Sequence, residues 1–240
     1  MIENLNDHLI GIAVGIRLLP NFTIDDQVGH ITEMILYSEN SFFNPQVFSK
    51  VSSDSSGKQI LFNEINSDKL IIDRSNVILE MDIGPDNKFD IDNVDEILKA
   101  FNNQIIHGVF DEFSIKKILR VGYIRRYLFK DEELINSILN KIVGEKITKV
   151  NELNLRFSKK YFDTKSISNE KVANFKNVIF TIEKKAEKEN EIRISFDFQK
   201  IFNPVIQSFA KIKFSKFLED AKYFNSKQFL PWLNSFYQET

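Results

Sequence analysis

The chain has 240 residues, of which 42% are hydrophobic, so it can bury a substantial core and is not expected to be intrinsically disordered. It contains no Cys, which excludes disulfides, thiolate catalysis and cysteine-ligated metal sites. The formal net charge of −2 conceals a division, because residues 1–112 carry 7 basic and 19 acidic side chains while residues 113–240 carry 25 and 15. The sequence therefore predicts an acidic half, 1–112, and a basic half, 113–240, that pack closely as two domains or one.

The first residues do not have the pattern of an export signal. Glu3 and Asp7 stand where such a signal has a cationic region, and the apolar run 9–16 ends at Arg17. No segment approaches the roughly 18 apolar residues that a membrane-spanning helix needs. We therefore expect a cytoplasmic protein without membrane contact.

In the acidic half, the pattern predicts a strand, a helix, three strands and a second helix. Residues 10–19 are rich in β-branched side chains, and Asp25 and Asp26 stand where the first turn of a helix favours negative charge. The serine-rich stretch 38–58 is expected to be a loop. Further strands are expected at 59–62, 69–73 and 77–83. The closing helix carries an apolar stripe of Val94, Ile97, Leu98, Phe101 and Ile105.

The basic half follows the same order. Residues 118–129 form its first expected strand, and acids at 131–133 begin the helix that follows. Three more strands are expected at 151–158, 177–184 and 191–198. Asn203-Pro204 is predicted to cap the last helix, with proline at its first position. The apolar stripe of that helix is Ala210, Phe214, Phe217, Ala221 and Phe224.

The two halves align when the sequence is shifted by 107 positions. Val14-Gly15 then coincides with Val121-Gly122, and the acids and apolar residues that follow coincide as well. Strands and helices in this order favour an α+β fold. We expect two pseudo-repeats of β-α-β-β-β-α, with mainly antiparallel sheets and the helices packed on one face.

This order, with Arg120-Val121-Gly122-Tyr123 opening the second half and an aromatic C-terminal helix, resembles an uncharacterised, sporadically distributed family of bacterial proteins built from two such repeats. The resemblance covers most of the chain in layout and few residues in sequence. Relatives continue that strand with an Arg-Tyr pair and an Asn, whereas this chain continues Ile124-Arg125-Arg126-Tyr127. The resemblance implies the fold and a place among accessory genes, including antiviral ones, and it carries no known active site.

Cations gather around the first strand of the basic half. Strand alternation places Arg120 and Arg126 on one face, together with Lys116, and leaves Arg125 on the apolar face, where it must pair with an acid or reach past the core edge. Phosphate recognition needs cations along one surface, and aromatic neighbours can stack bases. The segment therefore predicts a nucleic-acid interface made by Lys116, Lys117, Arg120, Arg125, Arg126 and Lys130.

Two other interpretations of these cations are open. They can form a merely solvated surface, or the basic half can dock on the acidic half of the same or another molecule, because complementary charge favours docking. The matching strand of the first half has Ala13, Gly15 and Leu19 facing the same way, so the surface belongs to one copy only. The charge division thus predicts a protein partner, or self-association through the acidic and basic halves.

The C-terminal segment concentrates aromatic side chains. We expect it to pack on the sheet as core, whereas exposure would mark a partner-binding site. The residues concerned are Phe229, Trp232, Phe236 and Tyr237.

No nucleophile–base pair, cofactor loop or metal set stands out. The histidines at 8, 30 and 107 lack metal-ligand spacing. Asp163, Glu183 and Lys185 imitate the acid, acid-x-Lys layout of metal-dependent nucleases, a pattern that also arises by chance in a lysine-rich chain. We therefore expect no catalytic residue, no metal and no cofactor.

Three functions follow, in order of preference. The first is a non-catalytic protein-interaction or adaptor component of a bacterial cytoplasmic system, with antiviral defence as one setting. The second is a nucleic-acid-binding protein that uses the basic strand 116–130. The third is a metal-dependent nuclease.

Overall fold

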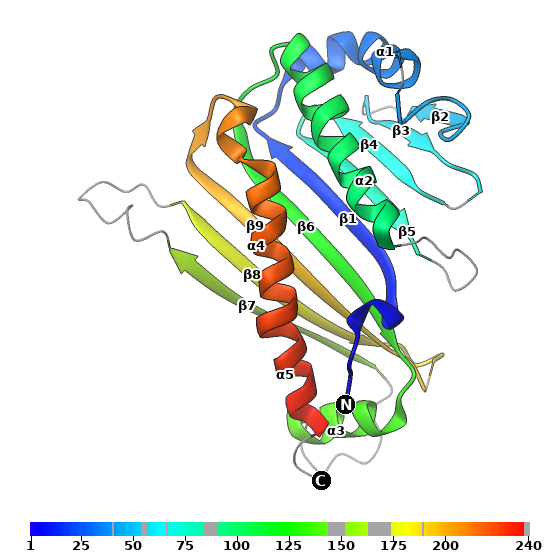
Figure 1. Cartoon of the computed structure of the whole chain (residues 1–240), viewed down its shortest axis with the longest axis vertical. Coiled ribbons are helices and arrows are strands. Elements are labelled where there is room, and N and C mark those ends of the chain that lie inside the picture. The colour runs from blue at the N-terminus through cyan, green and yellow to red at the C-terminus, as the bar shows by residue number, and fades with distance from the viewer. Residues whose placement is uncertain are drawn as a thin grey trace.

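The computed structural model describes residues 1–39, 41–53, 57–65, 67–83, 91–143, 152–162, 174–188 and 190–237, and of residues 91–93, 143 and 210 it describes the backbone only. Nine strands in this part of the chain form one antiparallel sheet (Figure 1), in the order β2-β3-β4-β5-β1-β6-β9-β8-β7. The strands are β1 (Leu9–Leu18), β2 (Lys50–Ser53), β3 (Gln59–Phe62), β4 (Lys69–Asp73), β5 (Asn76–Asp82), β6 (Ile118–Phe129), β7 (Leu153–Phe162), β8 (Phe175–Lys184) and β9 (Ile192–Ile206).

The centre of the sheet is the pairing of β1 with β6. It runs from Leu9 opposite Tyr127 to Leu18 opposite Ile118. β1 to β5 belong to the acidic half and β6 to β9 to the basic half, so the two halves share one sheet.

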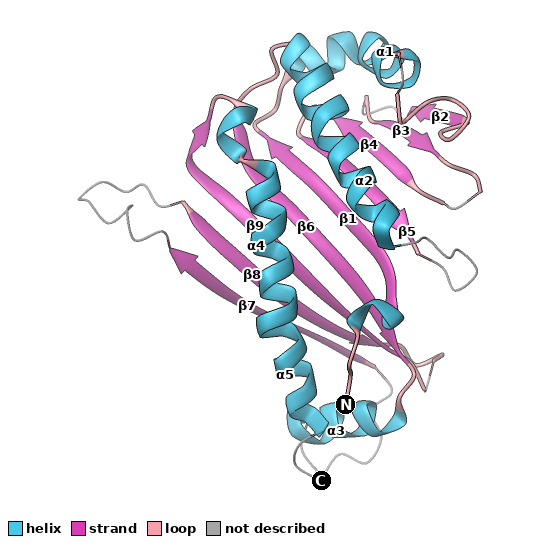
Figure 2. Cartoon of the chain, viewed as in Figure 1, coloured by secondary structure: helices cyan, strands magenta, loops and turns pink. Residues whose placement is uncertain are grey.

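The helices cover one face of this sheet (Figure 2). A helix formed by α2 and η2 and another formed by α4, η5 and α5 lie across that face, while α1 packs against η2 and α3 against η6. In the described part of the chain, no helix lies on the other face, which we call the open face. The helical elements are η1 (Leu5–His8), α1 (Phe22–Tyr37), α2 (Ile91–Ala100), η2 (Phe101–Phe110), α3 (Glu132–Val143), η4 (Phe209–Ile212), α4 (Phe214–Phe224), η5 (Asn225–Phe229), α5 (Leu230–Asn234) and η6 (Ser235–Tyr237).

Among the described helices, none is long and apolar enough to cross a membrane.

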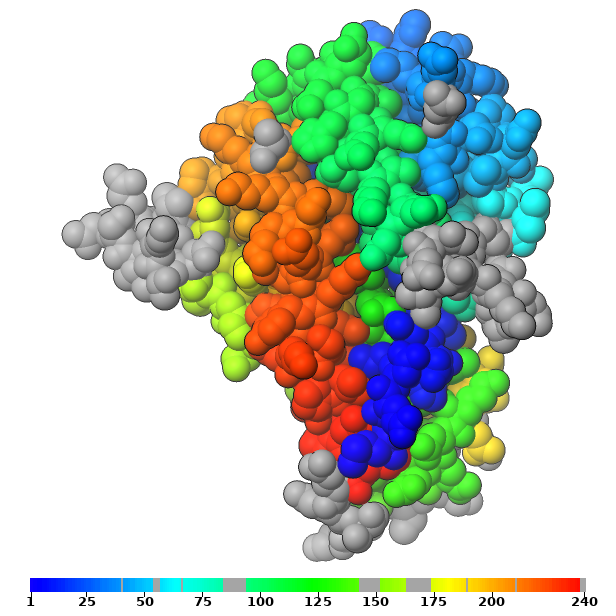
Figure 3. Space-filling model, viewed as in Figure 1, coloured from blue at the N-terminus to red at the C-terminus, as the bar shows by residue number. Residues whose placement is uncertain are grey.

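Aromatic side chains fill the layer between the sheet and the helices. Phe196 and Phe198 of β9 are fully buried there. The ring of Phe198 lies 5.3 Å from that of Phe217 in α4, and the ring of Phe196 lies 5.7 Å from that of Phe229 in η5. Each buried phenylalanine contributes roughly 1.5–3 kcal/mol relative to an exposed one. The packing of these rings therefore accounts for the position of the C-terminal helix (Figure 3), which crosses the molecule in orange and red.

The alternation of apolar residues located most strands correctly. β3, β4 and β6 have the predicted bounds 59–62, 69–73 and 118–129, and the α+β class with an antiparallel sheet is confirmed. One strand was missed, because β2 lies inside the stretch 38–58 that was expected to be a loop. Its side chains are all exposed, so it has no buried face from which the sequence could show a period of two.

The predicted cap at Asn203-Pro204 is wrong. Both residues lie within β9, and the last long helix begins at Phe214. The last pair between β8 and β9 is Phe175 with Ile201, so β9 has run past the end of β8 where the proline stands. A strand tolerates a residue without an N–H at such a place, because no ladder hydrogen bond to that neighbour is lost.

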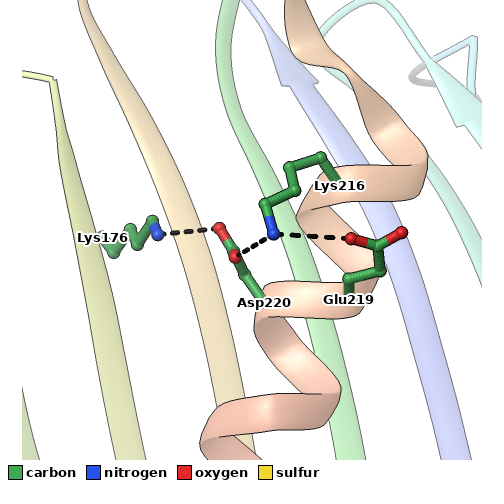
Figure 4. A network of polar contacts seen from close by, with 4 residues as sticks. All are labelled: Lys176, Lys216, Glu219 and Asp220. Carbon is green, nitrogen blue, oxygen red and sulfur yellow. Dashed lines mark hydrogen bonds and ion pairs between the residues drawn. The ribbon is translucent and has the colours of Figure 1, made fainter.

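An ion-pair network ties α4 to the sheet (Figure 4). The Nζ of Lys176 in β8 lies 2.7 Å from Oδ2 of Asp220, and Lys216 lies 3.4 Å from both Asp220 and Glu219. Burial alone would raise the pKa of Asp220, but the hydrogen bonds and charges of Lys176 and Lys216 together lower it below its ordinary value. The folded state therefore favours the ionised form of Asp220.

Truncating Phe229 should be among the most destabilising single changes in the chain. Its side chain is fully buried, and its ring lies 5.4 Å from that of Tyr127 and 5.2 Å from that of Phe180. We expect Phe229→Ala to lower the free energy of unfolding by about 3–5 kcal/mol in urea titrations. Tyr223→Ala, at a 59% exposed position of α4, is the matched control. Equal melting temperatures for the two variants would show that the C-terminal segment is not core.

The Lys176–Asp220 ion pair predicts a pH-dependent contribution to stability. A carboxylate whose pKa is lowered on folding stabilises the folded state at pH values above its pKa in the unfolded chain. This contribution is lost as the pH falls through its pKa in the folded chain. We expect Lys176→Met to cost about 1 kcal/mol at pH 7 and progressively less toward pH 3. Lys216→Met, which removes an exposed lysine, should cost less. A deficit for Lys176→Met that stays constant over this pH range would contradict the assignment.

Candidate functional site

The candidate site lies at the centre of the open face. The strand register aligns one row of residues across this face, from Ile71 and Ile78 through Gly15 and Gly122 to Gln199. Gly15 and Gly122 are directly opposite each other on the two central strands. Because neither residue has a side chain, the open face is hollow at its centre.

A depression of about 110 Å³ occupies this position. A Cβ atom on Gly15 would lie 3.1 Å from Cγ1 of Ile78 and from the carbonyl oxygen of Val77, so the glycine leaves room for Ile78 beside β1. A Cβ atom on Gly122 would meet only Cγ of Gln199, at 4.0 Å, so a side chain there would enter free space. The wall of the depression is formed mainly by Arg17, Ile78, Arg120, Ile124, Asp197 and Gln199.

Two arginines stand side by side at one end of the depression. Arg17 of β1 is directly opposite Arg120 of β6. Burial lowers the pKa of Arg120, and the nearby charges of Arg17 and Arg156 lower it further, while Asp197 opposes the shift. In the described part of the chain, neither Arg17 nor Arg120 has a carboxylate within 4.0 Å. Like charges opposite each other destabilise a sheet, and here the charge of Asp197 offsets this repulsion only in part, because burial and the neighbouring arginines still lower the pKa of Arg120.

Asp197 and Gln199 form the polar wall on β9. Gln199 is 7% exposed, and its Nε2 donates a hydrogen bond of 2.6 Å to Oδ2 of Asp197. The Oε1 of Gln199 accepts a long hydrogen bond of 3.5 Å from Arg120. The other carboxylate oxygen of Asp197, Oδ1, is buried and has no hydrogen-bond partner. Burial raises the pKa of Asp197, although Gln199, Arg120 and Arg156 act in the opposite direction.

The predicted cationic segment is divided between several surfaces. Arg120 and Arg126 lie on the open face, and the guanidinium of Arg126 lies 3.5 Å from the carboxylate of Glu80. Arg125 faces the helices, where it donates a hydrogen bond of 2.6 Å to Oδ1 of Asn6 and lies 5.7 Å from the centre of the Tyr127 ring. Of the two alternatives for Arg125, an acid partner or a position past the core edge, the first is not seen among the described residues, where its partner is the amide of Asn6.

The lysines of this segment lie outside β6. Lys116 and Lys117 are exposed residues of the connection before the strand, and Lys117 has a left-handed backbone with φ 67°. Lys130 follows the strand and lies 3.5 Å from Glu191. The predicted cations therefore do not form one continuous strip.

The aromatic C-terminal segment packs on the face of the sheet that bears the helices. Phe229 is fully buried and Phe236 is 7% exposed. The ring of Trp232, partly buried, stacks 5.1 Å from that of Phe180, and Tyr237 donates a hydrogen bond of 2.6 Å to Asp131. These side chains lie where the sequence placed them as core.

Part of the nuclease-like set cannot be placed, because Asp163 lies outside the described residues. Glu183 is exposed on β8, where it is paired with Asn154 of β7. Lys185 is exposed in the turn after β8. Within the residues that the structure describes, no group of three or more His, Asp or Glu could hold a metal ion.

Sequence reasoning missed most of this depression. The sequence pattern marks Arg17 only as the end of an apolar run, and it does not single out Asp197 and Gln199, although they alternate with Phe196 and Phe198. Two acceptor-bearing side chains on the polar face of a strongly alternating strand were the available signal. No signal in the sequence identifies the strand beside β9, because nothing local specifies that β9 pairs with β6.

No protein-family model matches the chain, and no curated protein matches it. The resemblance to the sporadically distributed bacterial family is therefore an expectation from the sequence. What the chain does has to be argued from its own residues.

Proposed function

We propose that the chain is a non-catalytic interaction protein that binds a protein partner on the open face of its sheet. The main support is the composition of that face over the basic half. The register of β6 to β9 aligns four exposed or half-exposed arginines there, Arg120, Arg126, Arg156 and Arg193. Arginine is enriched at protein interfaces, where its guanidinium pairs with carboxylates and packs on apolar surface.

Apolar and acidic side chains lie between these arginines. Ile78 and Ile124 are half-buried at the centre of the face, and Asp197 and Glu183 lie on β9 and β8. The closely spaced phosphates of a nucleic acid would meet these carboxylates. A protein surface offers apolar, acidic and basic groups together, so the mixture favours a protein partner.

Part of the opposite charge of the two halves is used within the chain. Arg126 of β6 lies 3.5 Å from Glu80 of β5, and Lys222 of α4 lies 2.6 Å from Asp95 of α2. Both ion pairs join the basic half to the acidic half of the same molecule. This favours an external partner over self-association through whole halves.

The cellular setting is part of the proposal. An adaptor role in a bacterial cytoplasmic system, including antiviral defence, rests on the resemblance of the sequence to accessory proteins. The non-catalytic role rests on the sequence, in which no nucleophile–base pair or cofactor loop stands out.

The proposal includes the origin of the chain from two repeats. The shift of 107 positions that aligns the halves makes Gly15 equivalent to Gly122, and these two residues are paired directly. A two-fold axis between antiparallel strands requires such a pairing of equivalent positions. From the centre outward, the order β1, β5, β4, β3 in one half corresponds to β6, β9, β8, β7 in the other.

Photo-crosslinking in the native host tests the docking surface. A photoreactive amino acid replacing Thr181, on the open face of β8, should give a discrete protein adduct that disappears when Arg156→Glu and Arg193→Glu are added. The same amino acid replacing Lys99, exposed on α2, is the positional control. Identical adducts from both positions, or adducts that survive the charge reversal, would remove the open face as the docking surface.

Nucleic-acid binding is the second candidate, supported by Arg120 and Arg126 on one face. Fluorescence anisotropy with labelled single- and double-stranded DNA and RNA separates the two candidates. A protein-binding face predicts no saturable binding at about 150 mM salt, where non-specific binding is already weak. Binding that falls steeply with salt and is abolished by Arg120→Glu with Arg126→Glu would establish the second candidate instead.

A further inference from the structure

The depression at the centre of the open face has more positive charge than its surroundings neutralise. Arg17 and Arg120 are opposite each other, and Arg156 is close enough to act on Arg120 and Asp197. Asp197 is the carboxylate among the lining residues. The depression thus has the charge pattern of an anion-binding site.

The polar wall of the depression also has an unused acceptor. The carboxamide of Gln199 is held by Asp197 on one side and by Arg120 on the other, so the wall is fixed in position. The buried Oδ1 of Asp197 has no donor within the described part of the chain. A buried acceptor without a donor is unfavourable, so a ligand hydroxyl that reaches the Asp197 carboxylate as the depression is filled would be favoured.

The two glycines supply the space. About 110 Å³ is several times the 10–15 Å³ of the same measure that one water molecule needs, so a small polyatomic group fits. The half-buried apolar side chains of Ile78 and Ile124 complete the wall. The depression lies on the open face of the sheet, so a larger molecule can extend from it over that face.

We propose that this depression binds a small phosphate ester, with Arg17 and Arg120 holding the phosphate and Asp197 accepting a hydrogen bond from a hydroxyl of the ligand. A phosphate dianion neutralises two arginines and offers oxygens to both guanidinium groups, whereas a carboxylate brings one charge and two oxygens. This inference stands on the depression alone and does not depend on a protein partner.

Isothermal titration calorimetry of the full chain tests this with three probes: glycerol 3-phosphate, inorganic phosphate and acetate. We expect glycerol 3-phosphate to bind at least tenfold more tightly than acetate and more tightly than inorganic phosphate, which lacks the carbon-linked hydroxyls. Asp197→Asn should reduce the preference for glycerol 3-phosphate over inorganic phosphate, because an amide oxygen is a weaker acceptor than a carboxylate.

The variants separate the site from general attraction to cations. Arg120→Gln should weaken glycerol 3-phosphate binding at least tenfold, while Arg193→Gln, on the same face outside the depression, should change it less than twofold. Gly122→Leu should abolish binding by filling the depression, and Gly122→Ala serves as its control. Thermal melts of each variant confirm that it is folded.

Three results would overturn the inference. These are no heat of binding for glycerol 3-phosphate, equal binding of acetate, and equal losses in Arg120→Gln and Arg193→Gln. None of them bears on the crosslinking result, so the phosphate site and the protein-docking face succeed or fail separately.

Discussion

The antiparallel pairing of β1 with β6 is the constraint on which the other features depend. It joins an acidic half to a basic half in one continuous sheet, and it places Gly15 opposite Gly122 at the centre. We call this pairing of β1 with β6 the seam. On the face of the sheet that bears the helices, both halves contribute helices to a shared aromatic core. On the other side, the same pair of glycines leaves the hollow that makes the open face a candidate binding surface.

The sequence separates acidic and basic residues into two halves, but in the folded chain some of these opposite charges are paired with each other. Some of the opposite charges meet across β1, as Arg126 of β6 does with Glu80 of β5, and some join the helices of the two halves, as Lys222 of α4 does with Asp95 of α2. At the centre of the open face, Arg17 and Arg120 face each other across the two central strands. Among the described residues of the wall beside them, the carboxylate is that of Asp197, which accepts a hydrogen bond from Gln199. Electrostatic strain of this kind is a better guide to a binding site than net charge.

Strand positions could be predicted because a sheet with one buried face imposes a period of two. Ile192, Ile194, Phe196 and Phe198 show that period and lie in β9. Strand order could not be predicted in the same way, since the pairing of β1 with β6 joins residues that are far apart in the sequence, such as Gly15 and Gly122, and is selected by tertiary packing. The candidate site was the feature that the sequence predicted least well, because it depends on strand order. Arg17, Arg120 and Asp197 come from three strands whose adjacency no local pattern specifies, and Asn203-Pro204 resembled a helix cap because its position beyond the end of β8 is also a tertiary property.

The seam itself is tested most directly by asking whether the two halves unfold together. Trp232 is the single tryptophan of the chain, so its fluorescence reports on the basic half. A Phe42→Trp variant that also carries Trp232→Phe reports on the acidic half. If β1 and β6 join the halves into one cooperative unit, urea titrations of the two proteins, each followed by fluorescence and by far-UV circular dichroism, give coincident transitions within each protein. A circular dichroism curve with two steps, of which each tryptophan follows only one, would contradict a shared sheet.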